Sequence, residues 1–296
     1  AIHATDAYCI SGGCTRFLLT MATNSIDIFL KGIDVAKAFL LKHSNSGLLG
    51  LHLEGPYINP IKRGAHLLEH IKQPTLDEVK LLLDKSEGIV KMMTLAPEQC
   101  NDEVIQLLLD NKVVVSAGHS NATYEQATAG FNKGITTATH LFNAMSPLEG
   151  RALGMVGAVY DHATVHSSIV CDGFHTSFAA VRISKKMMQE RLFLITDAVT
   201  ETREGAYKHL LKDDRYVLPD GTLSGSALTM IKAVNNCVNN AGIEFDEALQ
   251  MASLYPARAA QLQGFGKIDA GYVADVVVLT KTYEVKSVFR SGIQLW

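Results

Sequence analysis

The stretch VVVSAGHSNATYEQATAGFNKGITTATHLFN, residues 113–143, contains the pattern that decides the fold. A short apolar run at 113–117 is followed by Thr123-Tyr124-Glu125-Gln126, which is typical of a capping box that opens a helix. A second run, rich in β-branched residues, follows at 135–139. Strand, helix and strand at this spacing predict a βαβ unit, in which the two strands are parallel.

The same alternation extends over most of the chain. Short apolar or β-branched runs lie at 15–20, 48–53, 89–95, 113–117, 135–139, 165–170 and 192–196, and they end at intervals of about 22 to 42 residues. A second capping-box sequence, Thr75-Leu76-Asp77-Glu78, opens a helical stretch at 76–84. The pattern predicts an α/β fold of the (β/α)8 TIM-like barrel type, with the first strand missing from this chain because residues 4–13 favour a helix.

The last hundred residues change character. A polar stretch with turn signals at 219–221 is followed by helical patterns at 227–241 and at about 246–255. Residues 274–279 and 285–289 are β-rich and bounded by turn residues. We therefore predict a barrel domain at 1–262 and, at 263–296, remnant strands of a small β-sandwich domain.

Composition limits the classes of protein that this chain can be. Of the 296 residues, 47% are hydrophobic and 19% charged, and the net charge is −3, so the chain has apolar material for a large core and no basic block for nucleic acid. No apolar run reaches the ~18–20 residues of a membrane helix, and the first residues lack the features of a signal peptide. The five cysteines are scattered without a CxxC pair, which predicts a reducing, cytoplasmic location.

Three polar residues follow predicted strands, at the edge where a barrel places its active site. Glu54 follows the run at 48–53, His119 the run at 113–117 and His140 the run at 135–139. Two imidazoles and one carboxylate suit a catalytic zinc ion and leave a position for water, although iron, cobalt or manganese would also fit. Singly, each histidine is more typical of a packed core residue, and the alternative for Glu54 is an ordinary strand-end carboxylate that faces water.

Further candidates lie on the same side of the predicted barrel. Asp197 ends the last run and could accept a proton from a metal-bound water, or it could simply cap a turn. His66, Arg151 and His175 lie in loops, where Arg and His could hold a phosphate or carboxylate, or could be solvated charges. His52, two residues before Glu54, is interpreted as a packed histidine or as one that supports a metal ligand.

These motifs appear together in one known family. They are GLHLEGP (50–56), GAH (64–66), AGHS (117–120), THLFNAM (139–145), CDGFH (171–175), TD (196–197), TLSGSALTM (222–230), LYPAR (254–258) and AGYVAD (270–275). With them the chain resembles the N-acetylglucosamine-6-phosphate deacetylases of the amidohydrolase superfamily, over nearly its whole length. The resemblance implies hydrolysis of the acetamide of N-acetylglucosamine 6-phosphate to glucosamine 6-phosphate and acetate.

The resemblance also implies residue roles. Glu54, His119 and His140 would bind one divalent metal ion, most simply zinc. Asp197 would act as general base and then general acid, and His66 would polarise the acetyl carbonyl. The substrate-binding set implied is Ala65, His66, Asn143, Ala144, Arg151, His175, Leu223, Ser224 and Gly225. The family is typically a homodimer, in which the neighbouring subunit completes part of the phosphate site.

Two departures from the family pattern and several alternatives remain. The family's first barrel strand, with a residue that can touch a second metal, has no counterpart here, so a second metal site is doubtful. Ala152-Leu153 stands where the family usually has Glu-Pro, which would loosen the loop that holds Arg151. Alternatives are an amidohydrolase for another N-acetylated substrate, such as N-acetylgalactosamine 6-phosphate or an N-acyl amino acid, and a non-catalytic barrel scaffold.

Overall fold

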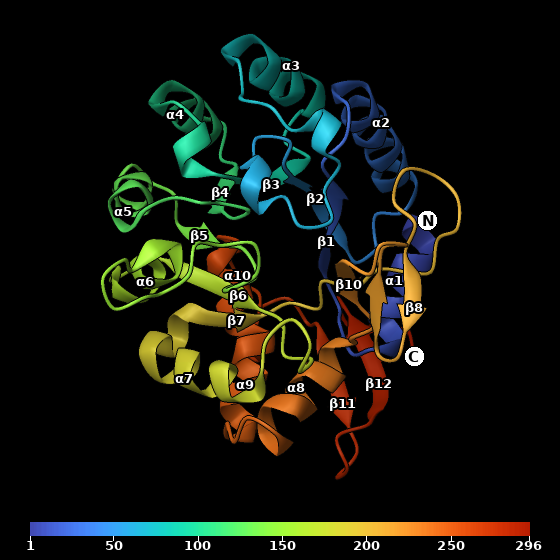
Figure 1. Ribbon diagram of the computed structural model, residues 1–296. Coiled ribbons are helices and arrows are strands. Elements are labelled where there is room, and N and C mark those ends of the chain that lie inside the picture. Colours follow the sequence, from blue (N-terminus) through green and yellow to red (C-terminus); the bar gives the residue numbers. More distant parts are fainter. The chain divides into compact units, whose positions relative to one another are not determined.

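A computed structural model describes all residues, 1–296, and its main element is a seven-stranded sheet whose strands follow one another in chain order (Figure 1). The strands are β1 (Phe17–Ala22), β2 (Leu48–Glu54), β3 (Val90–Leu95), β4 (Val114–Ala117), β5 (Thr137–Ala138), β6 (His166–Ile169) and β7 (Leu192–Leu194). From β2 to β6 the pairing is parallel, with Leu95 opposite Ala117 and Ala117 opposite Ala138. This confirms the predicted parallel α/β fold.

Helices connect the strands. They are α1 (Ile2–Ser11), α2 (Ile26–Lys42), α3 (Leu76–Ser86), α4 (Asp102–Asp110), α5 (Tyr124–Asn132), α6 (Gly154–Asp161), α7 (Phe178–Met188), α8 (Met230–Asn239), α9 (Phe245–Ala252) and α10 (Leu254–Ala259). Short 3-10 turns lie at Pro60–Lys62, Leu68–His70, Pro97–Gln99 and Gln189–Arg191. In Figure 1, α3, α4 and α5 lie on the outer side of β3 and β4.

The chain divides into two compact units, which we describe separately. Unit 1 consists of residues 1–17, 44–48 and 168–296, and unit 2 of residues 18–43 and 49–167. The predicted division at residue 262 into barrel and sandwich strands stays a prediction. Within unit 1 the expected strands near the C-terminus are present as β11 (Val276–Leu279), β12 (Val285–Arg290) and β13 (Ile293–Gln294), which form an antiparallel sheet.

Unit 1 also contains a sheet that the sequence did not predict. Strands β8 (Leu210–Lys212), β9 (Arg215–Val217) and β10 (Leu223–Ser226) pair antiparallel in the order β10-β9-β8. All three residues of β8 are exposed, so the period-two burial that marks a strand in sequence is missing. The sequence analysis described this part of the chain only as a polar stretch with turn signals.

The two predicted capping boxes have different outcomes. At α5 the Thr123 side chain accepts from Gln126 N and the Gln126 side chain accepts from Thr123 N, so the box is complete. At α3 Thr75 accepts from Glu78 N, but the Glu78 carboxylate accepts from Tyr57 Oη at 2.8 Å and pairs with Lys72. The Glu78 side chain therefore binds Tyr57 and Lys72 instead of completing the capping box.

Strand ends also move relative to the prediction. The first strand begins at Phe17 rather than at residue 15, and the Thr15 carbonyl accepts instead from Arg290 Nε at 2.9 Å. Pro256 lies in the first turn of α10, where its missing N–H costs no helical hydrogen bond, and the break between α9 and α10 falls at Ser253.

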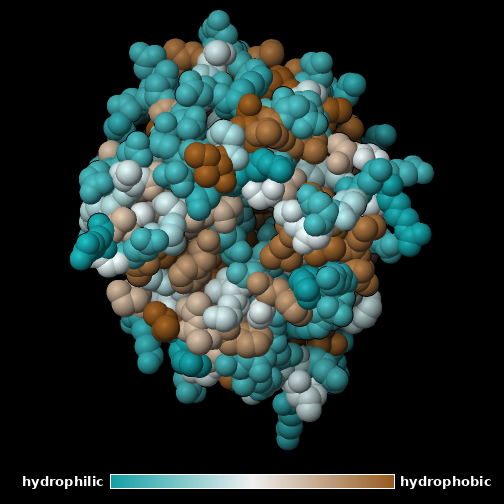
Figure 2. Space-filling view, viewed as in Figure 1, coloured by the Kyte–Doolittle hydropathy of each residue, from teal (hydrophilic) through white to brown (hydrophobic).

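Surface and helix composition add little functional information. No helix is both long enough and apolar enough to cross a bilayer. In the view of Figure 2 hydrophilic residues make up most of the outline, with hydrophobic groups between them. The most exposed large apolar residues, Leu41, Ile61 and Ile268, belong to different segments of the chain.

Candidate active site

Four predicted residues of unit 2 meet in one buried cluster. Glu54 is the last residue of β2, His119 and His140 follow β4 and β5, and His66 lies in the loop after β2; all four are 5% to 7% exposed. Glu54 Oε1 lies 3.1 Å from His119 Nε2 and 3.1 Å from His140 Nε2, and the two Nε2 atoms are 3.0 Å apart. Residues up to 86 positions apart in the sequence therefore present three donor atoms to one point.

The tautomer of His119 indicates what this point is suited to hold. His119 Nδ1 lies 2.9 Å from the Lys62 carbonyl, which can only accept, so Nδ1 carries a proton and neutral His119 presents the Nε2 lone pair. That lone pair faces the Glu54 carboxylate, and two acceptors at 3.1 Å repel each other unless a proton or a metal ion lies between them. Ligand atoms roughly 3.3 Å apart are what a tetrahedral ion with bonds of about 2.0 Å requires.

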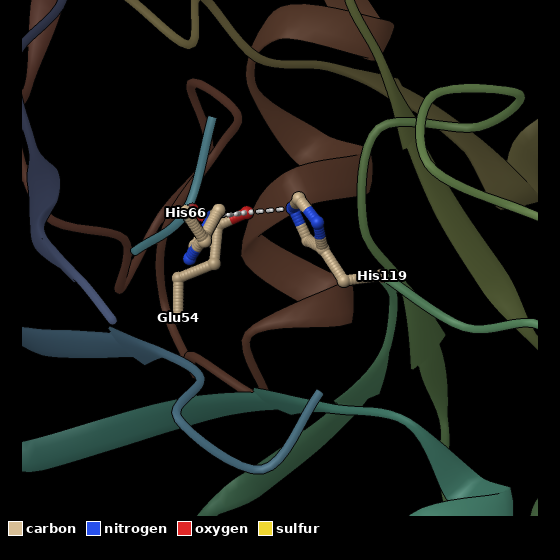
Figure 3. Close-up of side chains that lie close together, drawn as sticks. All are labelled: Glu54, His66 and His119. Carbon is tan, nitrogen blue, oxygen red and sulfur yellow. Dashed lines mark hydrogen bonds and ion pairs between the residues drawn. The ribbon is translucent and has the colours of Figure 1, made fainter. Parts of the chain in front are cut away.

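The fourth member of the cluster, His66, has a different arrangement. Its Nε2 lies 4.0 Å from Glu54 Oε1, which is farther than the 3.1 Å that separates Oε1 from the Nε2 atoms of His119 and His140. The possible ligand atoms of Glu54, His66 and His119 nevertheless all lie within 4.8 Å of one another (Figure 3). The backbone N–H of Thr23 points at His66 Nδ1 at 3.3 Å and cannot rotate away. The Thr23 hydroxyl, 2.7 Å from Nδ1 and 3.2 Å from the Glu54 carbonyl, can rotate to suit. His66 Nδ1 is therefore an acceptor, and Nε2 carries the proton that faces the cluster.

Burial and neighbouring groups shift the pKa values of Glu54 and His66. Burial alone would raise the pKa of Glu54, but the His119 and His140 rings beside its carboxylate outweigh burial and hold that pKa well below its usual range. Burial and the neighbouring His119 lower the pKa of His66 to about 3. His66 is thus a neutral imidazole at physiological pH, able to donate from Nε2, while Glu54 is an anion.

His52, which precedes Glu54 by two residues, does not join the cluster. Its Nδ1 lies 3.0 Å from Thr20 Oγ1 and its Nε2 2.7 Å from Thr94 Oγ1. Thr94 in turn contacts Thr139 Oγ1 at 2.7 Å, directly before His140. His52 is therefore a packed polar residue within a threonine network behind the strand ends.

The backbone at the strand ends is unusual in both units. His119 has φ 47°, His140 φ 39° and Asp197 φ 49°, a left-handed conformation that few non-glycine residues adopt. Such residues persist only where the surrounding structure holds them, and they concentrate at functional sites. The same conformation at three predicted site residues is information that the sequence did not contain.

The other predicted residues of unit 2 lie in neighbouring loops. Gly64, beside Ala65, has φ 56°. It lies against the His119 ring, since a Cβ at this position would be 3.6 Å from His119 Cε1. The Asn143 amide donates to the carbonyls of His140 and Leu141, and the Ala144 carbonyl accepts from Ser120 N at 3.0 Å. These bonds tie the loop after β5 to the loop after β4.

Arg151 lies at the tip of a short hairpin in unit 2. Glu149 and Ala152 exchange two backbone hydrogen bonds, of 3.0 and 3.2 Å, across this tip. Arg151 is exposed and takes part in none of the ion pairs of the chain. It is thus a free cation on a loop that is closed by backbone bonds even without the family's Glu-Pro sequence.

Unit 1 brings the remaining predicted residues together around Asp197. His175 Nε2 lies 3.7 Å from Asp197 Oδ2, and His175 Nδ1 donates to Asp172 Oδ2 at 2.5 Å. Ser226 N donates to the Asp197 carbonyl at 2.8 Å, so β10, with Leu223, Ser224 and Gly225, runs beside Asp197. A Cβ on Gly225 would lie 2.8 Å from Val199, so only glycine permits this approach.

Sequence reasoning missed three residues that hold site loops in place, two of them in unit 1. Asp172 accepts from the backbone N–H groups of Phe174 and His175 as well as from the His175 ring, and these bonds lower its pKa although burial opposes them. His209 Nδ1 lies 2.9 Å from Ser224 Oγ. The third is Glu98, in unit 2.

Glu98 joins the two loops that carry the clustered histidines. Its Oε1 accepts from Asn59 Nδ2 at 2.9 Å and Asn121 N at 2.7 Å, and its Oε2 accepts from Ser120 Oγ at 2.7 Å. Asn59 N also donates to the His119 carbonyl at 2.9 Å. The available signal was its position: Glu98 follows β3 closely, at the kind of strand end where Glu54 was singled out.

Comparison with known proteins identifies the class that this fold and cluster define. Residues 3–294 match the model of the Amidohydrolase family, and the chain belongs to that family, whose members are hydrolases that depend on metal ions. The N-acetylglucosamine-6-phosphate deacetylase of Haemophilus influenzae is 37% identical over 296 residues, which cover 96% of this chain and 76% of that protein. The N-acetylgalactosamine-6-phosphate deacetylase of a Shewanella strain is 33% identical, with 95% and 73% covered.

Solved structures agree. The crystal structure of N-acetylglucosamine-6-phosphate deacetylase from Pasteurella multocida superposes with a TM-score of 0.94 at 32% identity, covering 99% of this chain and 79% of that one. A Mycobacterium smegmatis deacetylase variant, solved in complex with N-acetyl-D-glucosamine-6-phosphate, gives a TM-score of 0.91 at 31% identity, with 98% and 79% covered. The predicted TIM-like architecture is confirmed.

Proposed function

We propose that this protein hydrolyses the acetamide of N-acetylglucosamine 6-phosphate to glucosamine 6-phosphate and acetate, a step of amino-sugar catabolism. The observation that carries the proposal is the convergence of Glu54 Oε1, His119 Nε2 and His140 Nε2 at 3.0 to 3.1 Å, with the His119 lone pair turned inward. The two relatives at 37% and 31% identity whose names or bound ligand specify this substrate support it.

Glu54, His119 and His140 would hold one divalent ion, for which we favour zinc because the set has two nitrogen ligands and one oxygen ligand. When bound, such an ion supplies a Lewis acid and lowers the pKa of water toward ~7. A second metal site has no support from the residues described above. His66 is assigned outside the ligand set because its Nε2 carries a proton.

Asp197 and His66 have separate roles in proton transfer and in stabilising the developing negative charge. Asp197 takes the proton of the attacking water, and His66 donates from Nε2 to the acetyl oxygen, on which negative charge develops. As the C–N bond breaks, Asp197 returns the proton to the departing amine, so that atoms and protons balance. Asp172 holds the proton of His175 on Nδ1, which leaves Nε2 to face Asp197 or the substrate.

Substrate recognition is assigned to the loops. Arg151 provides an unpaired guanidinium for the phosphate, and His175 provides a ring whose orientation is fixed by Asp172. Ala65, Asn143, Ala144 and the segment of Leu223, Ser224 and Gly225 would contact the sugar. We further propose that the protein is cytoplasmic and forms a homodimer. Light scattering of the purified protein would test the dimer.

The experiment measures release of acetate from N-acetylglucosamine 6-phosphate, with and without chelator and with zinc added back. N-acetylgalactosamine 6-phosphate, unphosphorylated N-acetylglucosamine and an N-acyl amino acid complete the panel. Turnover of the first substrate that chelation stops and zinc restores supports the proposal. Preference for the galactosamine substrate would favour the alternative that the Shewanella relative suggests, and no turnover by a folded, metal-loaded sample would contradict the proposal.

A further inference from the structure

The C-terminal end of α1, in unit 1, brings two cysteines together. Cys14 N donates to the Cys9 carbonyl at 2.8 Å, Gly13 N donates to the Ile10 carbonyl at 3.0 Å, and Gly13 has φ 75°. These are the two hydrogen bonds and the left-handed glycine of a Schellman motif. In that motif the side chains three positions before the cap and two positions after it touch, and here those residues are Cys9 and Cys14.

The two thiols are in different electrostatic states. The Cys9 thiol donates to the Cys14 sulfur, and this bond, together with burial, raises the pKa of Cys9. The same bond lowers the pKa of Cys14 although burial opposes it, while the nearby Arg290 guanidinium lowers the pKa of both thiols. The Cys14 thiol donates to the Arg16 carbonyl at 3.0 Å, and both cysteines are partly exposed.

The turn that holds the pair is itself anchored. The Gly12 carbonyl accepts from Ile231 N at 3.0 Å, and the Tyr8 hydroxyl donates to the Leu228 carbonyl at 3.0 Å. A Cβ on Gly12 would lie 2.8 Å from Thr229 Cβ. The end of α1, and with it the turn that carries both cysteines, is therefore fixed from both sides.

We propose that Cys9 and Cys14 form a redox-sensitive dithiol that low-molecular-weight disulfides, such as oxidised glutathione, convert to an intrachain disulfide. Cys14 loses the proton that it donates to the Arg16 carbonyl, and the resulting thiolate attacks one sulfur of oxidised glutathione, which releases one glutathione thiolate and leaves a mixed disulfide on Cys14. Cys9 then loses its proton and attacks the Cys14 sulfur, which releases the second glutathione. One disulfide is reduced to two thiols while two protein thiols become one disulfide. In a reducing compartment such a bond is transient rather than structural.

A second pair of cysteines in the same unit provides an internal control. Cys171 and Cys237 are both 0% exposed, and a hydrogen bond between their thiols raises the pKa of Cys171. These thiols are also hydrogen-bonded to each other, but their burial keeps oxidants away from them in the folded protein. Burial raises the pKa of the remaining thiol, that of Cys100, to about 12, so it too should stay reduced.

The experiment incubates the folded full chain with oxidised glutathione, blocks the remaining thiols by alkylation after denaturation, and maps tryptic peptides by mass. Cys9 and Cys14 lie in one peptide that ends at Arg16, so the disulfide makes that peptide two hydrogen atoms lighter than the reduced, unalkylated form. We expect this change alone, with Cys100, Cys171 and Cys237 alkylated. A peptide that is fully alkylated, or that retains glutathione, would overturn the proposal.

Two variants test the order of attack. Cys9→Ser removes the second thiol, so glutathione should stay attached to Cys14. Cys14→Ser leaves Cys9, which has the raised pKa, and its reaction with oxidised glutathione should be at least roughly tenfold slower than that of Cys14 in the Cys9→Ser variant. Equal or reversed rates would show that Cys14 is not the attacking thiol, and Cys171→Ser serves as the matched control for loss of a thiol in this unit.

Discussion

The two groups of candidate site residues differ in how tightly their members are held. In unit 2, Glu54 and its two nearest histidines are buried, and their donor atoms lie 3.0 to 3.1 Å apart. In unit 1, the Asp197 side chain is 32% exposed, and its Oδ2 lies 3.7 Å from His175 Nε2. A ligand set must be fixed before the ion arrives, whereas a carboxylate that takes and returns a proton needs contact with water and must not be locked into an ion pair.

The largest effect should come from breaking the tight group. In His119→Ala the lone pair facing Glu54 is lost, and we expect no detectable metal after dialysis and no detectable turnover, measured by elemental analysis and acetate release. The matched control is His52→Ala, a buried histidine of the same unit outside the cluster. It should keep its metal and lose about 1–3 kcal/mol of unfolding free energy, because Thr20 and Thr94 lose their partner.

Breaking the loose group should abolish chemistry while sparing the metal. Asp197→Asn removes the proton acceptor, so kcat should fall about 10²–10⁴-fold with metal content unchanged. Asp213→Asn, at an exposed aspartate of the same unit, is the control and should behave as the parent. If Asp197→Asn keeps more than about a tenth of the parent kcat, Asp197 is not the general base.

A smaller effect is expected where one residue supports the tight group indirectly. Glu98→Ala removes the acceptor that joins the loops of Asn59 and Ser120, so metal should bind about 10–100-fold more weakly in a chelator competition. Glu98→Gln should retain most of the affinity, because its amide group needs to face only the Ser120 hydroxyl, which can rotate.

The control for these Glu98 variants is Glu103→Ala, on the exposed side of α4. Unchanged metal affinity in Glu98→Ala, at unchanged thermal stability of the metal-free protein, would show that the joined loops do not position the ligands.

The smallest expected effect concerns the Arg151 hairpin. Leu153 has φ −69°, which proline also adopts, so Leu153→Pro should restrict the unbound loop without strain. Less conformational entropy, about 0.4–1 kcal/mol, should lower KM for the sugar phosphate about two- to fivefold and leave kcat unchanged. Leu153→Ala removes the same side chain without the ring; an equal KM change in both variants would contradict the entropic explanation.

The local sequence pattern predicted an element correctly where the residues of that element determine its structure. The runs at 48–53 and 89–95 are buried parallel strands, and the Thr123–Gln126 capping box forms as expected. Strand β8 could not be predicted because none of its residues is buried. The position of β1 could not either, because the Thr15 carbonyl pairs with Arg290, which is 275 residues away.

In the candidate site, too, the local sequence predicted some residues and missed others. Position after a strand was enough to single out Glu54, His119 and His140, since parallel strands end at one edge. Glu98 and Asp172 were missed because their importance lies in the partners they accept from, and those partners come from other loops or depend on a side-chain rotamer. No sequence pattern distinguishes an acceptor of three hydrogen bonds from a solvated carboxylate.

The sequence by itself determined the parallel α/β architecture, the residues at the strand ends and the resemblance to a family, because periodicity and motifs are properties of neighbouring residues. Only the tertiary structure decided the left-handed conformation of His119 and His140, the ring nitrogen that carries the proton in His66 and His119, and the contact between Cys9 and Cys14. Each depends on where hydrogen bonds and burial place single atoms, and those positions are set by packing between distant segments or, at the end of α1, by the geometry of the turn.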